Sequence, residues 1–320
     1  MQNRNIKGLY IHIPFCNNIC IYCDFYKMIS KEESKKEYIN YLIKELELKK
    51  DLLRDNNNNN SNNSNNCNNC NNIETIYIGG GTPSCLSLDD LKKLFSNLAK
   101  YLNLNKLSEF TIECNPNDIT LPLINLFKEY HVNRISLGVQ SFNNQKLKYL
   151  NRTHDKNIAI NAIKLLKNNG FNNINCDFIY GLEIKDDFCD NIDLIKEDLD
   201  IAINLNVPHI SFYSLIIENK TILNKFIKEN KYQEMDDDKE ADIYDFINEY
   251  LKKHHYIHYE VSNYALDNYM SKHNLIYWNN DYYLGLGANA SYYYNNTRYT
   301  NINNLKKYYQ GIDNLEMIYS

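Results

Sequence analysis

The feature of the sequence that most restricts its fold is a regular alternation of short apolar segments with longer amphipathic ones. Six segments have the length and composition of β-strands: GLYIHIP (8–14), TIYIGGG (75–81), EFTIECNP (109–116), RISLGVQS (134–141), NINCDFIYG (173–181) and HISFYSL (209–215). Helical patterns lie between and after them, at 31–53, 88–101, 121–129, 156–169, 186–204 and 236–253. This alternation predicts an α/β fold with right-handed βαβ units and a parallel sheet. Periodicity alone leaves open whether the six units form an open sheet or an incomplete barrel.

One segment interrupts the alternation. Between residues 56 and 72, 13 of 17 residues are Asn, and such a run has no apolar face whose burial could offset the entropy of ordering. We therefore predict a disordered insert. It contains Cys67 and Cys70 in a C-x-x-C arrangement, which would suit a redox or metal pair. A metal site needs a fold to hold it, so two chance cysteines in a low-complexity loop are the better interpretation.

Unusual residues gather where the predicted strands end. Three cysteines follow the first strand, a Gly-Gly-Gly-Thr run ends the second, and a carboxylate or amide stands late in each of the next three. The carboxyl ends of parallel strands converge on one rim, where α/β folds bind ligands, so we expect a shared ligand site there. In chain order these residues are Cys16, Cys20, Cys23, Gly79, Gly80, Gly81, Thr82, Glu113, Gln140 and Asp177.

The cysteine triplet indicates zinc or an iron–sulfur cluster. A structural zinc site takes four ligands, and the nearest fourth candidate, His12, lies inside the first strand. A [4Fe–4S] cluster held by three cysteines keeps one iron free for a small molecule, such as the amino and carboxylate groups of S-adenosylmethionine (SAM). One electron from the cluster would then cleave the sulfonium to a deoxyadenosyl radical, which is chemistry of the cofactor and not of side chains.

The spacing C-x3-C-x2-C, with the aromatic Tyr22 before the third cysteine, resembles the signature of the radical SAM superfamily, and GGGTP at 79–83 strengthens the resemblance. It implies a partial (β/α)6 barrel with a [4Fe–4S] cluster on Cys16, Cys20 and Cys23. It also implies that the glycine turn lets its backbone approach SAM closely. Arg152, which alone would be taken for a solvated helix residue, would pair with the SAM carboxylate. The implied SAM contacts are Tyr10, Tyr22, Gly80, Gly81, Thr82, Glu113, Gln140, Arg152 and Asp177.

Longer strings narrow the resemblance to one branch. LYIHIPFC, YIGGGTPS, IECNP, RISLGVQSF and DFIYGL are similar to the coproporphyrinogen III dehydrogenase-like (HemN/HemW) family, from about Leu9 to Ala290. The oxygen-independent dehydrogenase of that family has a further cysteine where this chain has Phe25. The haem-chaperone type has an H-N-x-x-Y-W motif, matched here by His273, Asn274, Tyr277 and Trp278.

The resemblance makes His273 the implied haem ligand, since imidazole is a common axial ligand of haem iron. The alternative is that His273 and the sole tryptophan pack a C-terminal lobe. Glu183 departs from the proline that is usual at this point of the family. Relatives also continue with a further helical region. We therefore expect a barrel core at 1–220 and a small C-terminal region at 221–320 that is incomplete by comparison.

Three functions fit these observations. The first is a haem chaperone that binds the cluster, SAM and haem, passes haem to an apoprotein, and takes electrons from a ferredoxin or flavodoxin. The second is an oxygen-independent coproporphyrinogen III dehydrogenase, and the third a zinc-bound or metal-free scaffold with a decayed SAM site. Whether SAM is turned over stays open. A net charge of -5 with interspersed Lys and Glu argues against a nucleic-acid partner. No apolar run reaches the roughly 18–20 residues of a membrane helix, and no leader is visible, so we expect a cytoplasmic protein.

Overall fold

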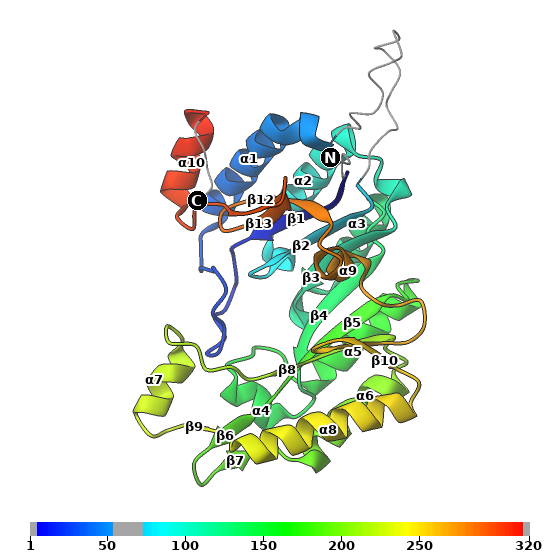
Figure 1. Cartoon of the computed structure of the whole chain (residues 1–320), viewed down its shortest axis with the longest axis vertical. Helices are drawn as coiled ribbons and strands as arrows, with labels where there is room; N and C mark the ends of the chain where they lie inside the picture. Colours follow the sequence, from blue (N-terminus) through cyan, green and yellow to red (C-terminus); the bar gives the residue numbers. More distant parts are fainter. Residues whose placement is uncertain (1–4, 54–72, 316–320) are drawn as a thin grey trace.

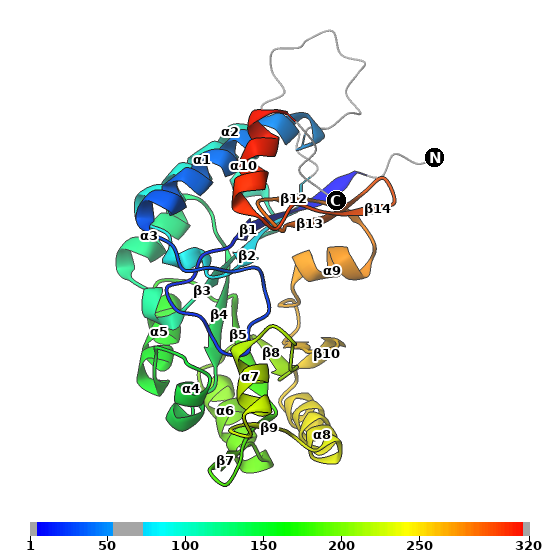
Figure 2. The ribbon, with the colours of Figure 1, turned by 90° about the vertical axis from the view of Figure 1, so that its left-hand side faces the viewer.

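The computed structural model describes residues 5–53 and 73–315. The predicted insert at 56–72, with Cys67 and Cys70, lies outside these residues. The described chain forms an 11-stranded sheet, in which six strands run parallel side by side in the order expected of successive βαβ units (Figure 1). These six are β1 (Ile6–Ile13), β2 (Thr75–Gly80), β3 (Glu109–Cys114), β4 (Arg134–Gln140), β5 (Ile174–Tyr180) and β8 (His209–Ser214). The predicted α/β class and parallel sheet are confirmed, and the curved array of strands in Figure 2 is consistent with a partial barrel.

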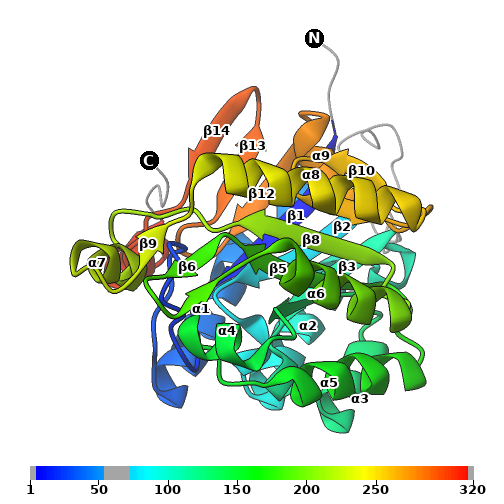
Figure 3. The same cartoon turned by 90° about the horizontal axis from the view of Figure 1, so that it is seen from below.

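Helices follow the parallel strands and cover their outer side, as Figure 3 shows for α2, α3, α5 and α6. Each of these four helices begins at a side chain that accepts a hydrogen bond from a backbone N–H of the first turn, which satisfies a donor that the helix itself cannot use; the capping residues are Ser87, Thr120, Asp155 and Asn191. The helices are α1 (Glu32–Lys49), α2 (Leu88–Tyr101), α3 (Leu121–Glu129), α4 (Asn144–Tyr149), α5 (Lys156–Asn168) and α6 (Ile192–Asn204).

The helix predicted over 186–204 is wrong in its first part. The chain forms a short hairpin there, with β6 (Leu182–Ile184) and β7 (Phe188–Cys189), and α6 begins only after the Asn191 cap. A third short strand, β9 (Gln233–Glu234), pairs with β6. The amide of Gln233 donates to the Glu183 carboxylate, so the residue that departs from the family's proline helps to hold β9 in place.

Residues after position 220 extend the same sheet at both edges. On the β8 side, β11 (Asn263–Ala265) and β10 (Ile257–Glu260) add antiparallel strands. On the other side β12 (Tyr282–Leu286) lies parallel to β1 and is followed by β13 (Ser291–Tyr294) and β14 (Thr297–Thr300). The remaining helices are α7 (Ile222–Lys228), α8 (Asp237–Lys253), α9 (Lys272–Trp278) and α10 (Leu305–Asp313). In the described part of the chain, no helix is long and apolar enough to cross a membrane.

The carboxylate of Glu45, on α1, ties the C-terminal elements to the barrel. It is fully buried and accepts hydrogen bonds from the Gly287 backbone N–H at 2.7 Å, the Tyr308 hydroxyl at 2.6 Å and the Asn301 amide at 2.9 Å. The Lys49 ammonium pairs with it at 2.7 Å. The Glu45 carboxylate therefore holds the loop after β12 and the start of α10 against α1. These hydrogen bonds and the ion pair satisfy its oxygens, as a buried carboxylate requires.

The inner face of the parallel strands is polar. Ser136 on β4 donates to Asp177 on β5 at 3.0 Å, and the Asn175 amide donates to the Ser136 hydroxyl at 2.8 Å. The Tyr77 hydroxyl on β2 donates to Glu113 on β3 at 2.8 Å. Closed (β/α)8 barrels, in which eight parallel strands form a complete ring, usually fill their interior with bulky apolar side chains. A polar interior instead suits a site that binds polar groups.

Candidate functional site

The three cysteines lie in the loop between β1 and α1, which turns back on itself at its base. The Cys16 backbone N–H donates to the Met28 carbonyl at 3.0 Å, and the Met28 N–H donates to the Pro14 carbonyl at 2.7 Å. Two distant segments reach this loop. The Thr82 hydroxyl lies 3.5 Å from the Cys16 sulfur, and Arg152 Nη1 lies 3.1 Å from the Cys20 sulfur. The structure thus brings the Gly-Gly-Gly-Thr turn and Arg152 together with the cysteines, and the contact of these residues with SAM stays a prediction.

The thiols influence one another's ionisation. Burial raises the pKa of Cys16 to about 11, with added repulsion from Cys23 and Cys20. Burial also raises the pKa of Cys23, while the nearby Lys27 ammonium lowers it. Three thiolates in this loop would repel each other unless a cationic group were bound between them, and a metal centre supplies such a charge.

The donor set can be compared with the two metal groups that the sequence leaves open. Within residues 5–53 and 73–315, no three His, Cys, Asp or Glu side chains come close enough together to bind a single metal ion. The thiols of a [4Fe–4S] cluster each bind a different iron, so they stand farther apart than the ligands of one ion. His12, the candidate fourth zinc ligand, already uses both ring nitrogens, at 2.9 Å from the Tyr26 carbonyl and 2.9 Å from the Tyr10 hydroxyl. The donors present fit a cluster better than mononuclear zinc.

Arg152 is half-buried against the cysteine loop and is not a solvated helix residue. Its Nη2 donates to the Gly138 carbonyl at 2.8 Å. Its Nε is buried and has no hydrogen-bond partner among the described residues. A buried donor without a partner is costly unless an anion or water completes it. The position beside Cys20 fits the carboxylate of an amino-acid ligand bound at the open iron of a cluster.

The glycine turn is packed too tightly for any other residue. Gly80 has a φ of 115°, in the left-handed region, and a Cβ added there would lie 2.5 Å from the His12 ring. A Cβ on Gly79 would lie 2.7 Å from the Glu113 carboxylate, and one on Gly81 would lie 2.6 Å from the Phe15 carbonyl. The Gly80 N–H donates to Glu113 at 3.0 Å. The protein's own packing therefore requires these glycines, a reason that the sequence does not reveal, and the approach of SAM to this backbone stays a prediction.

We expect Gly80→Ala to lower the free energy of unfolding by roughly 2–4 kcal/mol, because it combines a left-handed backbone with overpacking against His12. Urea unfolding of the two proteins measures the difference. Gly170→Ala is the matched control: Gly170 also has a left-handed φ, of 88°, but an added Cβ there meets nothing within 4 Å. An equal loss in both variants would show that backbone conformation alone accounts for the effect and that the contact with His12 costs nothing.

The predicted polar contacts on β3, β4 and β5 also face this end of the barrel. Burial raises the pKa of Glu113 to about 7, against the lowering effect of the Tyr77 hydrogen bond. Burial raises the pKa of Asp177 as well, while hydrogen bonds from Ser136 and Asn175 lower it. Gln140 has a φ of 66° at a register shift in the pairing of β4 with β5. A non-glycine residue held in that conformation is more frequent at functional sites than elsewhere.

Of the two predicted tyrosines, Tyr10 lies on β1, before the cysteine loop, and Tyr22 lies within the loop between Cys20 and Cys23. The Tyr26 carbonyl can only accept a hydrogen bond, so His12 Nε2 carries the proton and the Tyr10 hydroxyl donates to Nδ1. Tyr22 packs on a small apolar cluster separate from the main core, formed by Leu150, Leu182, Ile184 and Phe188. His12 therefore ties the end of the cysteine loop to β1. An imidazole inside an apolar strand was the feature of the sequence that could have indicated this structural role. From the sequence, His12 was considered only as a zinc ligand.

His273 lies away from the cysteines, at the first turn of α9, and is completely buried. Its Nδ1 is 2.6 Å from the Thr75 hydroxyl and its Nε2 is 2.7 Å from the Tyr277 hydroxyl. Burial lowers the pKa of His273 to about 3, which keeps the ring neutral. In this arrangement both nitrogens are engaged, as in the packing alternative. The packing alternative also expects Trp278 to be packed inside the C-terminal lobe, but this residue is 56 % exposed. The assignment of His273 to haem stays a prediction.

Glu109 seats α9, a role that sequence reasoning missed. Its buried carboxylate accepts hydrogen bonds from the backbone N–H groups of Lys272 at 2.8 Å and His273 at 3.1 Å, and from the Ser271 hydroxyl at 3.2 Å. Glu109 is the first residue of β3 and α9 begins 163 residues later, so no local pattern connects them.

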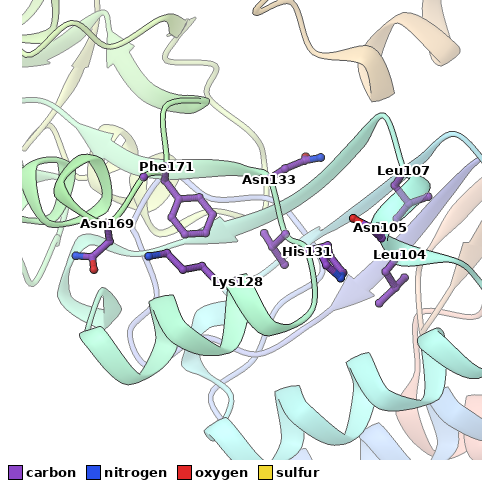
Figure 4. Close-up of a pocket in the computed structure, with 10 residues that line it drawn as sticks. Leu104, Asn105, Leu107, Lys128, His131, Asn133, Asn169 and Phe171 are labelled. Carbon is purple, nitrogen blue, oxygen red and sulfur yellow. The ribbon is translucent and has the colours of Figure 1, made fainter.

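A separate pocket of about 350 Å³ lies at the opposite end of the barrel strands (Figure 4). The turns that precede β3, β4 and β5 line it, and Figure 4 shows Lys128, His131 and Asn169 among the lining side chains. Since ligands of parallel α/β folds bind at the carboxyl ends of the strands, we do not assign this pocket to the candidate site.

Comparison with known proteins places this fold and site in a class. The family model described as "Radical SAM superfamily" matches residues 66–195, which begin after the cysteine triplet. Among solved structures, coproporphyrinogen III oxidase (HemN) from Escherichia coli, a radical SAM enzyme, has a TM-score of 0.80 and 22% identity, covering 99% of this chain and 71% of that chain. The family model and the cysteine loop point to the radical SAM class of proteins, and the likeness to HemN shows the same fold.

Curated relatives make the assignment narrower. The chain is 39% identical over 302 residues to the haem chaperone HemW of Lactococcus lactis, covering 94% of this chain and 73% of the relative. It is 34% identical over 304 residues to HemW of Bacillus subtilis, covering 95% and 75%. The chain belongs to the HemW family of radical SAM proteins.

Proposed function

We propose that this protein is a haem chaperone that holds a [4Fe–4S] cluster and SAM, binds haem and transfers it to an apoprotein. The observation that carries the proposal is the cysteine loop with the Thr82 hydroxyl and the Arg152 guanidinium directed at its sulfurs, in a chain whose curated relatives are named haem chaperones. When bound, the cluster and SAM would supply one-electron chemistry.

The residues divide this work between them. Cys16, Cys20 and Cys23 would hold the cluster. Arg152 would orient a carboxylate through its free Nε, since a planar guanidinium binds carboxylate by more than one hydrogen bond. Glu113 is held by Tyr77 and the Gly80 N–H and would keep the glycine turn in place beside the ligand. Tyr10, Tyr22, Gly81, Gln140 and Asp177 complete the proposed SAM surroundings.

A direct test is to reconstitute the protein anaerobically, titrate it with haem and follow SAM cleavage in the same sample. Haem binding at a ratio of one per chain supports the proposal, and its absence overturns it. Formation of protoporphyrinogen from coproporphyrinogen III with SAM and a reductant would instead support the dehydrogenase. We expect no protoporphyrinogen to form, because this chain has Phe25 at the position where the dehydrogenase has a further cysteine.

We expect His273→Ala to weaken haem binding by at least tenfold, and Tyr277→Phe to strengthen it. Nε2 must leave the Tyr277 hydroxyl, 2.7 Å away, before it can bind iron, and the phenylalanine removes that competing hydrogen bond. Absorbance titration with haem gives the dissociation constants, and urea unfolding gives the stability of each variant. Loss of stability in both variants with unchanged haem affinity would favour the packing role and remove His273 as a ligand.

A further inference from the structure

The end of β4 departs from a regular strand. Leu137 pairs with Cys176 of β5 and Gln140 pairs with Phe178, so β4 takes three steps where β5 takes two. Such a bulge leaves an extra residue outside the hydrogen-bonding ladder, and Gln140 has a left-handed φ of 66°. A non-glycine residue keeps that conformation only where its surroundings hold it. The contacts around residues 138–142 therefore decide the shape of this strand end.

Two side chains from the loop between α4 and α5 bind the carbonyl groups of the bulge. Arg152 Nη2 donates to the Gly138 carbonyl at 2.8 Å, and His154 Nε2 lies 2.9 Å from the Val139 carbonyl. A carbonyl oxygen can only accept a hydrogen bond, so His154 Nε2 carries the proton and donates it. The two carbonyl groups directly before Gln140 are therefore both held by side chains of this one loop.

The other side of the bulge is fixed without His154. The Asp198 carboxylate, on α6, is buried and accepts hydrogen bonds from the Ser141 hydroxyl at 2.7 Å and the Phe142 backbone N–H at 2.6 Å. Because residues 141 and 142 are anchored in this way, loss of the His154 hydrogen bond would let the strand relax before them, at residues 138–140.

The burial of His154 is costly for a residue that only fills space. Its side chain is 3 % exposed, and its Nδ1 is buried without a hydrogen-bond partner among the described residues. Burial and the nearby Arg152 charge lower the pKa of His154 to about 4, so the ring is neutral and Nδ1 is an acceptor that lacks a donor. A leucine could fill the same space without an unsatisfied nitrogen. The hydrogen bond to Val139 is what the imidazole adds.

We propose that His154 is a positioning residue of the SAM site. Its hydrogen bond holds Gln140 in the left-handed conformation and keeps the Gly138 carbonyl in reach of Arg152. This inference rests on the proposed function, which assigns Gln140 and Arg152 to SAM. The Arg152 guanidinium is then fixed at two points, the Gly138 carbonyl and the Cys20 sulfur 3.1 Å away, and its free Nε has a defined direction toward a carboxylate. His154 acts through these residues and does not itself touch the ligand.

The test compares the binding of SAM with that of decarboxylated SAM, which lacks the carboxylate, to anaerobically reconstituted protein. We expect His154→Leu to lower the preference for SAM over decarboxylated SAM roughly tenfold, the size of effect that follows loss of a hydrogen bond to a charged group. His154→Gln should keep the preference of the parent, because its amide N–H can reach the Val139 carbonyl as Nε2 does. Isothermal titration calorimetry gives the dissociation constants, and analysis of iron and sulfide shows that the cluster content is equal.

Two further variants separate positioning from stability. Arg152→Met/His154→Leu should show the same preference as Arg152→Met alone, since a residue that acts through Arg152 has no effect on carboxylate recognition once Arg152 is replaced. Leu166→Ala, in the buried core of α5, should lower stability in urea unfolding by leaving a cavity, but it should leave the preference unchanged.

An unchanged preference in His154→Leu, or a further fall when His154→Leu is added to Arg152→Met, would overturn the positioning role and leave the proposed function intact. If His154→Leu does not fold, His154→Asn replaces it, because its amide is one methylene shorter than that of His154→Gln. Equal preferences in these two amide variants would then overturn the role. Parent protein that has its full iron and sulfide but does not bind SAM would overturn both proposals.

Discussion

Replacing Cys20 by serine is expected to abolish the iron–sulfur cluster, so that iron and labile sulfide per chain fall to background after anaerobic reconstitution. Two thiolates leave a second iron of the cluster without a protein ligand. The Arg152 guanidinium, 3.1 Å from the Cys20 sulfur, would face a neutral hydroxyl in place of an anionic thiolate, which weakens their charge-assisted hydrogen bond. Chemical analysis of iron and sulfide checks the result, and circular dichroism shows whether the fold is retained.

Cys85→Ala is the matched control for this prediction. Cys85 is buried, and its thiol donates to the Phe15 carbonyl at 3.4 Å, one residue from Cys16, yet it is not a predicted ligand. This variant should keep its iron and sulfide. If Cys85→Ala lost the cluster and Cys20→Ser kept it, Cys20 would not be a ligand and Cys85 would take its place.

Glu45→Ala is expected to lower the free energy of unfolding by about 3–5 kcal/mol, as found when one partner of a buried ion pair is removed. The change leaves the Lys49 ammonium without its carboxylate, and it leaves the Gly287 N–H and the Tyr308 hydroxyl buried without that acceptor. Urea unfolding measures the effect. Glu47→Ala, at an exposed position of the same helix, should change stability by less than about 0.5 kcal/mol.

Glu45→Gln separates the two contributions to this effect. The amide oxygen can still accept one or two of the hydrogen bonds but carries no charge, so an intermediate loss is expected. A loss in Glu45→Ala no larger than in Glu47→Ala would mean that α10 and the loop after β12 are held by apolar packing alone.

The strands of the barrel were predictable because each is a short apolar run bounded by turns. All six predicted strands match β1 to β5 and β8 in place and direction. The rim residues were predictable for the same reason, since parallel strands bring their carboxyl ends together whatever their separation in sequence. Thr82, which follows β2, meets the cysteine loop in this way, whereas Arg152 lies between α4 and α5 and was expected there only from the family resemblance.

The remaining features depend on contacts that no local pattern contains. Strands β6, β7, β9 and β11 have only two or three residues each, too few for alternation to be visible. Glu45 and Glu109 look like ordinary charged residues in the sequence, and only the fold shows that they are buried and saturated with hydrogen bonds. His273 shows the converse: its motif was visible, but the engagement of both ring nitrogens by Thr75 and Tyr277 was not.

The parallel pairing of β1 with β12 has a consequence for synthesis of the chain. The outer edge of β1 has its hydrogen-bonding partner only at residues 282–286, so β1 must wait for a strand that is synthesised about 270 residues later. At a translation rate of roughly 5–20 residues per second, that wait lasts on the order of 15–55 s. During this time β1 is an open sheet edge, which is the kind of surface that pairs with other chains. The nascent protein is therefore exposed to aggregation along this edge until β12 emerges from the ribosome.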